Sequence, residues 1–202
     1  MDFSLRQHGG RVFIWRNETE DPPYTFKCEL DKMRCSGTTK TGAQCRRNTV
    51  KYLDKCFQHL KSEMGLVVKP STIPGAGDGL FTTRDRKVGE KIIQYHGEIM
   101  DQQEIDERYQ ATEPVTAPYV VEEKKNRFID AACNRGTAAF VNHKAIAQSN
   151  CRWLVSRAPN PAVWVVARKN IKATTGNPTE LFISYGQQYQ MNEPGITFRT
   201  TR

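Results

Sequence analysis

Three cysteines and one histidine in the N-terminal third of the chain have spacings that suit a metal ion. Cys35, Cys45, Cys56 and His59 follow the pattern C-x9-C-x10-C-x2-H. Thiolates and an imidazole are preferred ligands of tetrahedral Zn²⁺, and four protein ligands make the site structural. We therefore expect one structural zinc ion here. Four reduced, buried side chains without metal are the alternative, and Cys28 is either a substitute ligand or a spare thiol.

Two further features of this stretch favour zinc. A segment this short rarely buries enough apolar surface to fold without a metal or another cross-link. Residues 34–47, RCSGTTKTGAQCRR, also resemble small Cys-rich modules with the pattern C-x-G-x-T-K-x-G-x-x-C-[KR], closed by C-x-x-H. That resemblance implies zinc and says little about function.

Three separated segments carry the residues of a second candidate site. The first reads IPGAGDGLF (73–81) and is followed by YHGE (95–98). The second contains FIDA (128–131) and FVNH (140–143), and the third reads ELFISYG (180–186). Closely spaced glycines let the backbone approach a ligand. Taken singly, an Asn-His pair or a tyrosine at a strand end is usually ordinary packing.

In this order, the three segments resemble the SET-domain lysine methyltransferases over roughly residues 65–190. Such enzymes move a methyl group from S-adenosylmethionine (AdoMet) to a protein lysine. The implied fold is mainly β, a β-clip-like SET domain of several small sheets. It ends in a C-terminal pseudoknot, where the segment with Tyr185 passes under the segment with Asn142. The implied substrate is a histone tail or another basic protein.

The resemblance also implies individual roles. Tyr95 and Tyr185 are the implied catalytic residues, and Tyr95, Ile183 and Tyr189 are the implied substrate-binding residues beside the target lysine. Asp130 is read as a structural hydrogen-bond acceptor, and Phe198 is a candidate for covering the adenine. The implied cofactor-binding residues are Ala76, Gly77, Asp78, Gly79, Tyr119, Asn142, His143 and Tyr185.

These residue types suit methyl transfer to an amine. The attacking lysine must be neutral, although its ordinary pKa is about 10.4. A channel lined by tyrosines would remove water from the ammonium and favour the neutral form. Aligning the amine with the methyl group can be worth roughly 7 kcal/mol or more. Weak C–H···O contacts to neutral oxygens would add about 1 kcal/mol each, and the step requires no metal.

The sequence departs from the family pattern at several positions. Thr137 stands where the family has Asn, Ala139 where it has Arg, and Lys144-Ala145 where it has Ser-Cys. These departures support an alternative function: a weak or inactive SET scaffold that binds chromatin or nucleic acid through the basic zinc module. The ISYGQQY segment (183–189) is closest to compact viral SET proteins, which predicts a viral or parasite source.

Short β-rich runs broken by Gly and Pro predict the elements that position these residues. The best helix candidate is 101–110, with Asp101 able to cap it. We divide the chain into an N-terminal segment (1–27), a zinc module (28–61), a SET domain (65–190, inserted region about 101–126) and a tail (191–202). Strands are predicted at 12–15, 66–68, 79–81, 91–95, 119–121, 127–129, 152–155, 163–166 and 181–183.

Charge is unevenly distributed along the chain. Residues 27–61 hold nine Lys/Arg against three Asp/Glu, which is +6 of the net +8. This stretch is either a patch for nucleic acid, a nucleosome or an acidic protein surface, or a solvated module. Acidic residues in the inserted region either attract a basic peptide, since this region faces the substrate in relatives, or form a solvated helix face.

The sequence contains no apolar run of membrane-spanning length and no signal-peptide core. We therefore expect a protein that is neither secreted nor in contact with a membrane. The expected location is the nucleus, or the host nucleus for a viral or parasite protein, and otherwise the cytoplasm. Relatives that form dimers make a homodimer an additional expectation.

Overall fold

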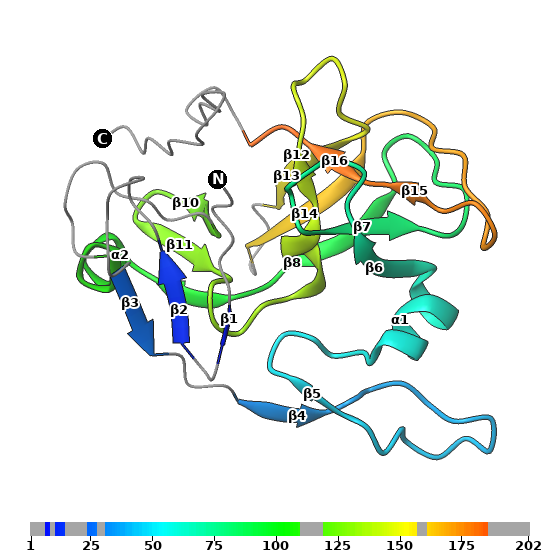
Figure 1. Cartoon of the computed structure of the whole chain (residues 1–202), viewed down its shortest axis with the longest axis horizontal. Coiled ribbons are helices and arrows are strands. Elements are labelled where there is room, and N and C mark those ends of the chain that lie inside the picture. The colour runs from blue at the N-terminus through cyan, green and yellow to red at the C-terminus, as the bar shows by residue number, and fades with distance from the viewer. Residues whose placement is uncertain are drawn as a thin grey trace.

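The computed structural model describes residues 7–8, 11–14, 24–27, 31–109, 119–156 and 161–185. Within these residues, the strands form six small sheets of two or three strands each (Figure 1). Two α-helices and one 3-10 helix join them. The mainly β architecture predicted from the sequence is confirmed.

The strands of the described residues are two to six residues long. The first strands are β1 (Gln7–His8), β2 (Arg11–Ile14), β3 (Tyr24–Lys27), β4 (Lys32–Arg34) and β5 (Asn48–Val50). The next are β6 (Leu66–Pro70), β7 (Asp78–Thr82), β8 (Lys91–Tyr95), β9 (Glu98–Met100), β10 (Val120–Lys124) and β11 (Arg127–Asp130). The last are β12 (Asn142–His143), β13 (Cys151–Ser156), β14 (Ala162–Ala167), β15 (Thr179–Glu180) and β16 (Phe182–Ile183). The helices are α1 (Phe57–Met64), α2 (Gln102–Tyr109) and the 3-10 helix η1 (Thr137–Phe140).

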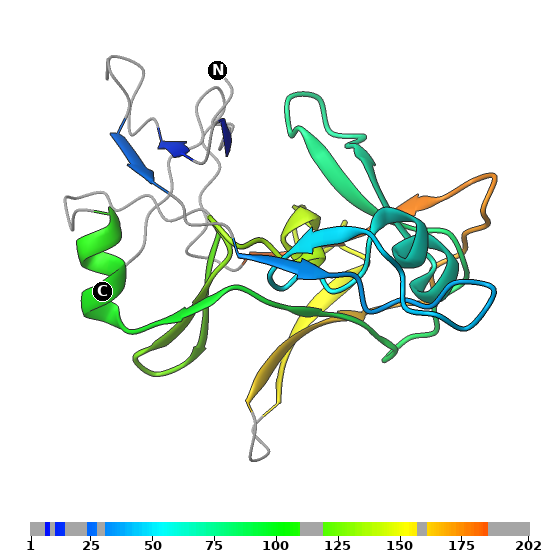
Figure 2. The same cartoon turned by 90° about the horizontal axis from the view of Figure 1, so that it is seen from below.

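The core lies against the sheet of order β13-β14-β8, in which β14 is the antiparallel centre. Val163, Val165 and Val166 of β14 are 0% exposed. Such a nearly continuous buried run is expected for a central strand, and β-branched residues suit it. In Figure 2 the β13–β14 hairpin projects from the body of the molecule. This sheet places Tyr95, at the end of β8, next to the core.

A second sheet, of order β15-β7-β6, carries the glycine-rich segment. Leu80 and Phe81 of β7 are almost fully buried. β15 pairs antiparallel with β7, with Glu180 opposite Phe81. The sheet therefore brings the third segment of the sequence beside the first.

Helix α2 is capped at its N-terminus as the sequence predicts. The Glu104 backbone N–H donates to the Asp101 carboxylate over 2.9 Å, and the Asp101 N–H donates to the Glu104 carboxylate over 2.8 Å. This reciprocal pair is a capping box. The other end of the helix is anchored by Arg108 and Tyr109, which both bond to buried Asp130.

The zinc module packs on the SET side through α1, which leads directly into β6. Gly65 ends α1 in a left-handed conformation, with φ of 64°. The buried Arg86 guanidinium donates to the Met64 and Gly65 carbonyls and to the Glu90 carboxylate. Figures 1 and 2 place α1 and α2 at opposite ends of the molecule.

All nine predicted strands overlap observed strands, and the predicted helix corresponds to α2. The sequence missed the helices α1 and η1 and the short strands β1, β3, β4, β5, β9, β12 and β15. Tyr189, Phe198 and Cys28 lie outside the described residues. The division into four regions stays a prediction.

Candidate functional site

The pairing of two very short strands brings the second and third segments together. β12 and β16 run parallel, with Asn142 opposite Phe182 and His143 opposite Ile183. The Lys144 backbone N–H extends the pairing by donating to the Ile183 carbonyl over 3.0 Å. Asn142 and His143 therefore lie beside the chain that leads to Tyr185, as the expected pseudoknot requires.

Both the backbone and the side-chain hydroxyl of Tyr185 bond to the segment 141–143. Its backbone N–H donates to His143 Nδ1 over 3.0 Å, and its hydroxyl donates to the Val141 carbonyl over 2.7 Å. The His143 and Tyr185 rings also meet edge to face, with centroids 5.2 Å apart. Burial raises the pKa of the Tyr185 phenol and lowers the pKa of the His143 imidazole. Both groups are therefore neutral at physiological pH.

Tyr95 lies in the same apolar cluster as Tyr185. Only 4% of Tyr95 is exposed, and its hydroxyl donates to the Tyr119 carbonyl over 2.8 Å. The Trp153 ring packs edge-on against Tyr95, with centroids 5.5 Å apart. Burial, and then the neighbouring Tyr185, raise the pKa of the Tyr95 phenol well above its usual value. The cluster thus contains two protonated phenols from distant parts of the chain.

The glycine-rich segment meets the other two segments at Gly79. A Cβ atom at Gly79 would lie 2.2 Å from Glu180 Oε1 and 3.2 Å from Asn142 Nδ2. Asn142 Nδ2 donates to the Asp78 carbonyl over 3.1 Å and to the Glu180 carboxylate over 3.2 Å. The missing side chain of Gly79 therefore leaves room for Glu180 and Asn142.

Gly77 differs from Gly79 in its surroundings. Gly77 adopts a left-handed φ of +67°, which favours glycine, and a Cβ there would meet nothing within 4 Å. Ala76, Gly77 and Asp78 lie at or beside the start of β7, the edge at which Asn142 bonds to Asp78. The backbone at Gly77 thus faces open space close to Asn142.

Glu180 is a central site residue that the sequence did not single out. It is 4% exposed and accepts hydrogen bonds from the Ser71 hydroxyl, the Thr72 hydroxyl and the Thr72 backbone N–H at 2.6–2.7 Å. Burial raises the pKa of its carboxyl, but these donors outweigh burial, so the net shift is downward. The ionised carboxylate ties the chain before β7 to β15.

Asn150 makes a similar link that the sequence did not single out. Its side-chain amide donates to the Glu180 carbonyl over 2.8 Å and accepts from the Phe182 N–H over 2.7 Å. The amide therefore mimics a paired strand beside β15 and β16. An asparagine several residues after the Asn-His pair was the only signal in the sequence.

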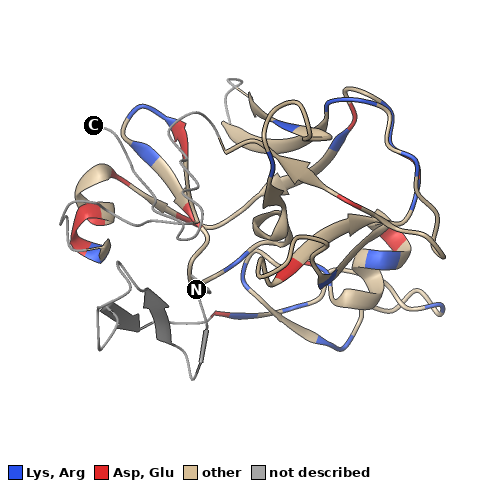
Figure 3. Cartoon of the chain, turned by 45° about the horizontal axis from the view of Figure 1, so that its top comes forward, with Lys and Arg blue, Asp and Glu red and all other residues tan. Residues whose placement is uncertain are grey.

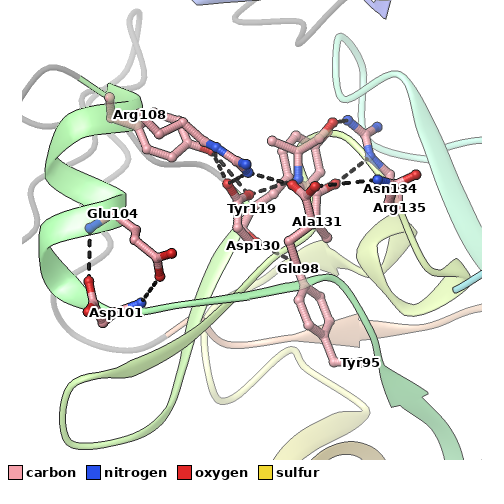
Figure 4. Close-up of polar contacts among 12 residues, drawn as sticks. Tyr95, Glu98, Asp101, Glu104, Arg108, Tyr119, Asp130, Ala131, Asn134 and Arg135 are labelled. Atoms are coloured by element: carbon pink, nitrogen blue, oxygen red, sulfur yellow. Dashed lines mark hydrogen bonds and ion pairs between the residues drawn. The ribbon is translucent and has the colours of Figure 1, made fainter. Parts of the chain in front are cut away.

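Asp130 is the structural acceptor that the sequence predicts. Its carboxylate accepts from the Arg108 guanidinium, the Tyr109 hydroxyl and the Ala132 N–H (Figure 4). Glu98 shares the Arg108 guanidinium in the same network. Burial raises the pKa of the Asp130 carboxyl, and the donors oppose that rise. This network fixes β11 and α2 beside Tyr119.

Arg135 is a further residue that sequence reasoning missed. Its guanidinium lies 3.9 Å from the Tyr119 ring centroid and 5.7 Å from the Phe140 ring centroid. It donates to the Ala131 carbonyl over 3.2 Å, as Figure 4 shows. Arg135 therefore restrains Tyr119, whose carbonyl accepts the Tyr95 hydroxyl.

The departures from the family pattern have identifiable surroundings. Thr137 is buried at the start of η1, and Ala139 is half-buried in it. The Lys144 ammonium lies 3.8 Å from the Phe182 ring centroid, a cation–π contact. Two of the substituted positions therefore lie in η1, shortly before Asn142, and the third contacts β16.

The four predicted zinc ligands converge. The ligand atoms of Cys35, Cys45, Cys56 and His59 all lie within 4.8 Å of one another. His59 Nδ1 is 3.4 Å from both Cys35 Sγ and Cys56 Sγ. Tetrahedral Zn²⁺ with ordinary bond lengths would separate nitrogen and sulfur by about 3.6 Å. The spacing therefore fits a zinc ion at the centre.

The surroundings of the cluster support a closed structural site. His59 Nε2 contacts the Thr38 carbonyl at 2.9 Å, which orients Nδ1 toward the thiols. A side chain at Gly37 would collide with the His59 ring. Cys56 lies at the N-terminus of α1, where burial raises its pKa but the backbone N–H groups of His59 and Gln58 lower it to about 6 overall. The helix N-terminus therefore favours the thiolate form of Cys56, whereas a backbone hydrogen bond lowers the pKa of Cys45 but burial and the neighbouring cysteines raise it overall.

Comparisons with known proteins agree with this geometry. The SET domain family model matches residues 77–186. The H3 lysine-36 specific histone-lysine N-methyltransferases of Mus musculus and Homo sapiens are each 36% identical over 104 residues. Each match covers 49% of this chain and only 4% of the relative. Both relatives come from mammals, so the comparisons do not support a viral source.

A solved structure is similar over a larger part of the chain. Polycomb repressive complex 2 of Chaetomium thermophilum, in an autoinhibited conformation bound to S-adenosylmethionine, is 27% identical with a TM-score of 0.51. The similarity covers 60% of this chain and 15% of that chain. In the described part of the chain, neither α-helix has the length and apolar character needed to cross a membrane. From the family match and the convergent segments, we conclude that the chain belongs to the SET-domain family and is related to histone-lysine methyltransferases.

Proposed function

We propose that the protein is an AdoMet-dependent protein-lysine N-methyltransferase that acts on a histone tail or another basic protein in the nucleus. The observation that carries the proposal is the β12–β16 pairing, which joins Asn142 and His143 to the chain leading to Tyr185. The relatives that methylate histone H3 lysine-36 support a histone substrate. Their similarity to this chain is confined to a small part of their length.

The cofactor would bind where the first and second segments meet. We assign it to the backbone of residues 76–79, to Asn142 and His143, and to Tyr119 and Tyr185. The open space at Gly77 and the Asn142–Asp78 contact favour this edge of β7. When bound, AdoMet supplies an electrophilic methyl group on a positively charged sulfur.

Tyr95 and Tyr185 would hold the target lysine and keep its amine neutral. Burial keeps both phenols protonated, so neither places a negative charge beside the amine. Each hydroxyl donates its proton to a carbonyl, so each phenol oxygen would meet the methyl group as an acceptor of weak C–H···O contacts. Tyr189 and Ile183 would complete the channel. The residues thus desolvate and orient the amine without acting as bases.

The acidic face of α2 suits a basic substrate. Asp101, Glu104 and Glu107 are exposed, and the first two also form the capping box. Exposed carboxylates attract Lys/Arg-rich peptides and mainly increase their association rate. α2 is also held rigidly beside β11 by Arg108. A histone tail could therefore approach from this side.

Calorimetric titration with AdoMet, followed by mass spectrometry of histones incubated with enzyme and AdoMet, tests the proposal. We expect saturable AdoMet binding and a gain of methyl groups on lysine. Tyr185→Phe should lower methyl transfer by about 100-fold while AdoMet binding changes little, because misplacement of a reacting group costs that much. The matched control is Tyr52→Phe, because Tyr52 belongs to the zinc module and the substitution keeps its ring stacked on His96 of the SET side.

Each outcome has a distinct meaning. A silent titration would favour the inactive scaffold that the substitutions at Thr137, Ala139 and Lys144 allow. Full activity of Tyr185→Phe would remove the role assigned to that phenol. Binding of AdoMet without transfer to any histone would redirect the search to other basic proteins.

A further inference from the structure

The zinc module carries exposed positive side chains that neither the predicted zinc ligands nor the proposed active site uses. They come from β4, the loops of the module and α1. In Figure 3 the ribbon of this part of the chain carries several blue Lys and Arg positions. We call these side chains, together with the exposed ring of Phe57, the basic surface; its cations are Arg34, Lys40, Arg46, Arg47 and Lys61.

The acidic residues of the module do not neutralise this surface. Residues 31–64 contain eight Lys/Arg and three Asp/Glu. Asp31 pairs with Lys51 over 2.9 Å, and Glu63 pairs with Lys55 over 2.7 Å. Both pairs use lysines outside the basic surface. The module therefore keeps a strong local positive potential.

Several members of the basic surface are held in place. The Arg34 guanidinium donates to the Cys45 carbonyl over 2.9 Å and to the Gln44 carbonyl over 3.1 Å. The Arg47 guanidinium stacks over the Phe57 ring, 4.7 Å from its centroid. Fixed cations lose less side-chain entropy when they bind a ligand than free ones do. The zinc-stabilised loops thus organise the surface in advance.

Phe57 gives the surface an apolar centre. It is 70% exposed, at the first position of α1, and Lys61 follows one turn later on the same helix face. A nucleic acid offers sugars and bases between its phosphates, against which an aromatic ring can pack. A peptide with acidic side chains offers less of such surface. The combination of cations and an exposed ring favours nucleic acid.

The distribution of charge over the whole molecule points the same way. The exposed acidic residues Asp101, Glu104 and Glu107 lie on α2, at the end of the molecule opposite α1 (Figure 3). A polyanion would approach the zinc module and avoid α2. A basic polypeptide would do the reverse.

We propose that the basic surface binds the phosphate backbone of duplex DNA without base specificity. The cations would neutralise phosphates and release counterions, and Phe57 would pack against the sugar edge. The proposal goes beyond lysine methylation and does not depend on it. In a protein that methylates histones, such a surface would hold the enzyme on nucleosomal DNA.

Fluorescence anisotropy with a short labelled DNA duplex tests this proposal in the zinc-loaded full chain. We expect Arg46→Gln/Arg47→Gln to weaken binding at least about 10-fold at low salt. The slope of log K against log salt should fall in magnitude by about 1.8, since each phosphate contact contributes about 0.9. Phe57→Ala should weaken binding by a factor that changes little with salt.

The control removes the same charge from another place. Lys124→Gln/Lys125→Gln lies in the exposed β10–β11 turn and should change the affinity less than about 2-fold. An equal loss in both double variants would overturn the proposal in favour of non-specific net charge. Absence of DNA binding by the unmodified protein would also overturn it. So would equal competition by a polyglutamate peptide, which would identify an acidic protein surface as the partner.

Two measurements keep these variants interpretable. Zinc content near one equivalent shows that the module is folded, because the substitutions leave all four ligands in place. Unchanged AdoMet binding shows that the SET side is intact. Loss of DNA binding with both properties retained supports the proposal and cannot arise from misfolding.

Discussion

Glu180 accepts hydrogen bonds from Ser71 and Thr72, which lie 109 and 108 positions away, and from Asn142, which lies 38 positions away. A carboxylate that is nearly fully buried is costly unless several donors compensate it. Here the donors come from the chain before β7 and from β12. The charge of one residue therefore holds together two of the segments assigned to the cofactor.

Replacing Glu180 tests this interpretation. We expect Glu180→Gln to lower the free energy of unfolding by about 1–3 kcal/mol, because its amide NH₂ would face donors. AdoMet binding should weaken as well, since a neutral amide is a weaker acceptor for Asn142 than the carboxylate, although the bond from Asn142 to the Asp78 carbonyl remains. Denaturant unfolding and calorimetry measure the two effects. Glu122→Gln, an exposed position on β10, should be neutral, and equal effects at both positions would contradict the interpretation.

Glu180 also predicts how stability changes with pH. Its folded-state pKa is lowered below the ordinary value of 4.5, so the carboxylate stabilises the folded state above that value. The contribution is lost as pH falls below 4.5 through the lower folded pKa. We expect the unmodified protein to lose stability in this acidic range more steeply than Glu180→Gln does. Parallel curves for the two proteins, from urea unfolding at several pH values, would contradict this prediction.

At the scale of elements, α2 depends on an ion pair that is largely buried. Asp130 is 0% exposed, and Arg108 reaches it from the last turn of α2. Breaking such a pair leaves one uncompensated charge, whereas replacing both partners is usually milder. The helix and β11 are therefore energetically coupled.

A double-mutant cycle measures this coupling. Arg108→Met should lower the free energy of unfolding by roughly 3 kcal/mol or more, because it leaves the Asp130 carboxylate buried with fewer donors. In the background of Asp130→Asn, the same substitution should cost less. Additive effects in thermal or denaturant unfolding would show that the pair carries no coupling.

The predicted elements form because of residues close to them in the sequence, whereas several of the missed elements form only because distant segments pair. Runs such as Val163–Val166 and the Asp101–Glu104 capping box are set by neighbouring residues, so pattern reasoning finds them. β12 and β15 contain only two residues each and exist because of long-range pairing. Helix α1 carries no start signal in the sequence, because Cys56 at its N-cap makes no side-chain capping hydrogen bond and its first turn has no acidic residue.

The candidate site shows the same limit. The three segments and the four zinc ligands could be found from residue types and order. The roles of Glu180, Asn150 and Arg135 could not, because they depend on partners brought close only by the fold. The cofactor and substrate roles themselves stay predictions.

At the scale of the whole molecule, the Cys3His cluster lies in a module whose described side chains bury little apolar surface apart from its cysteines, so a bound zinc ion would stabilise it. Cys35, Cys45 and Cys56 form a buried cluster of their own. The module reaches the SET side through α1 and through the Tyr52–His96 ring contact. Loss of zinc should therefore disorganise the module before the sheets.

Metal analysis of purified protein should give about one zinc per chain. Cys45→Ser should lose most of this zinc and unfold at a lower temperature, since metal binding and folding are coupled. Cys151→Ala, which changes a buried thiol outside the cluster, should keep its zinc. A folded module without metal in the unmodified protein would contradict the assignment.

The β12–β16 pairing has a consequence for how the chain can vary. The residues between His143 and Phe182 form a loop that the pairing closes, and the β13–β14 hairpin lies within it. The entropy of closing a loop grows only with the logarithm of its length, so doubling the loop costs about 0.6 kcal/mol. Insertions into the hairpin would thus leave Asn142 and Tyr185 side by side. The pairing of β12 with β16 keeps the two segments together whatever the length of the chain between them. Residues that are close only because they are neighbours in the sequence would be separated by such an insertion.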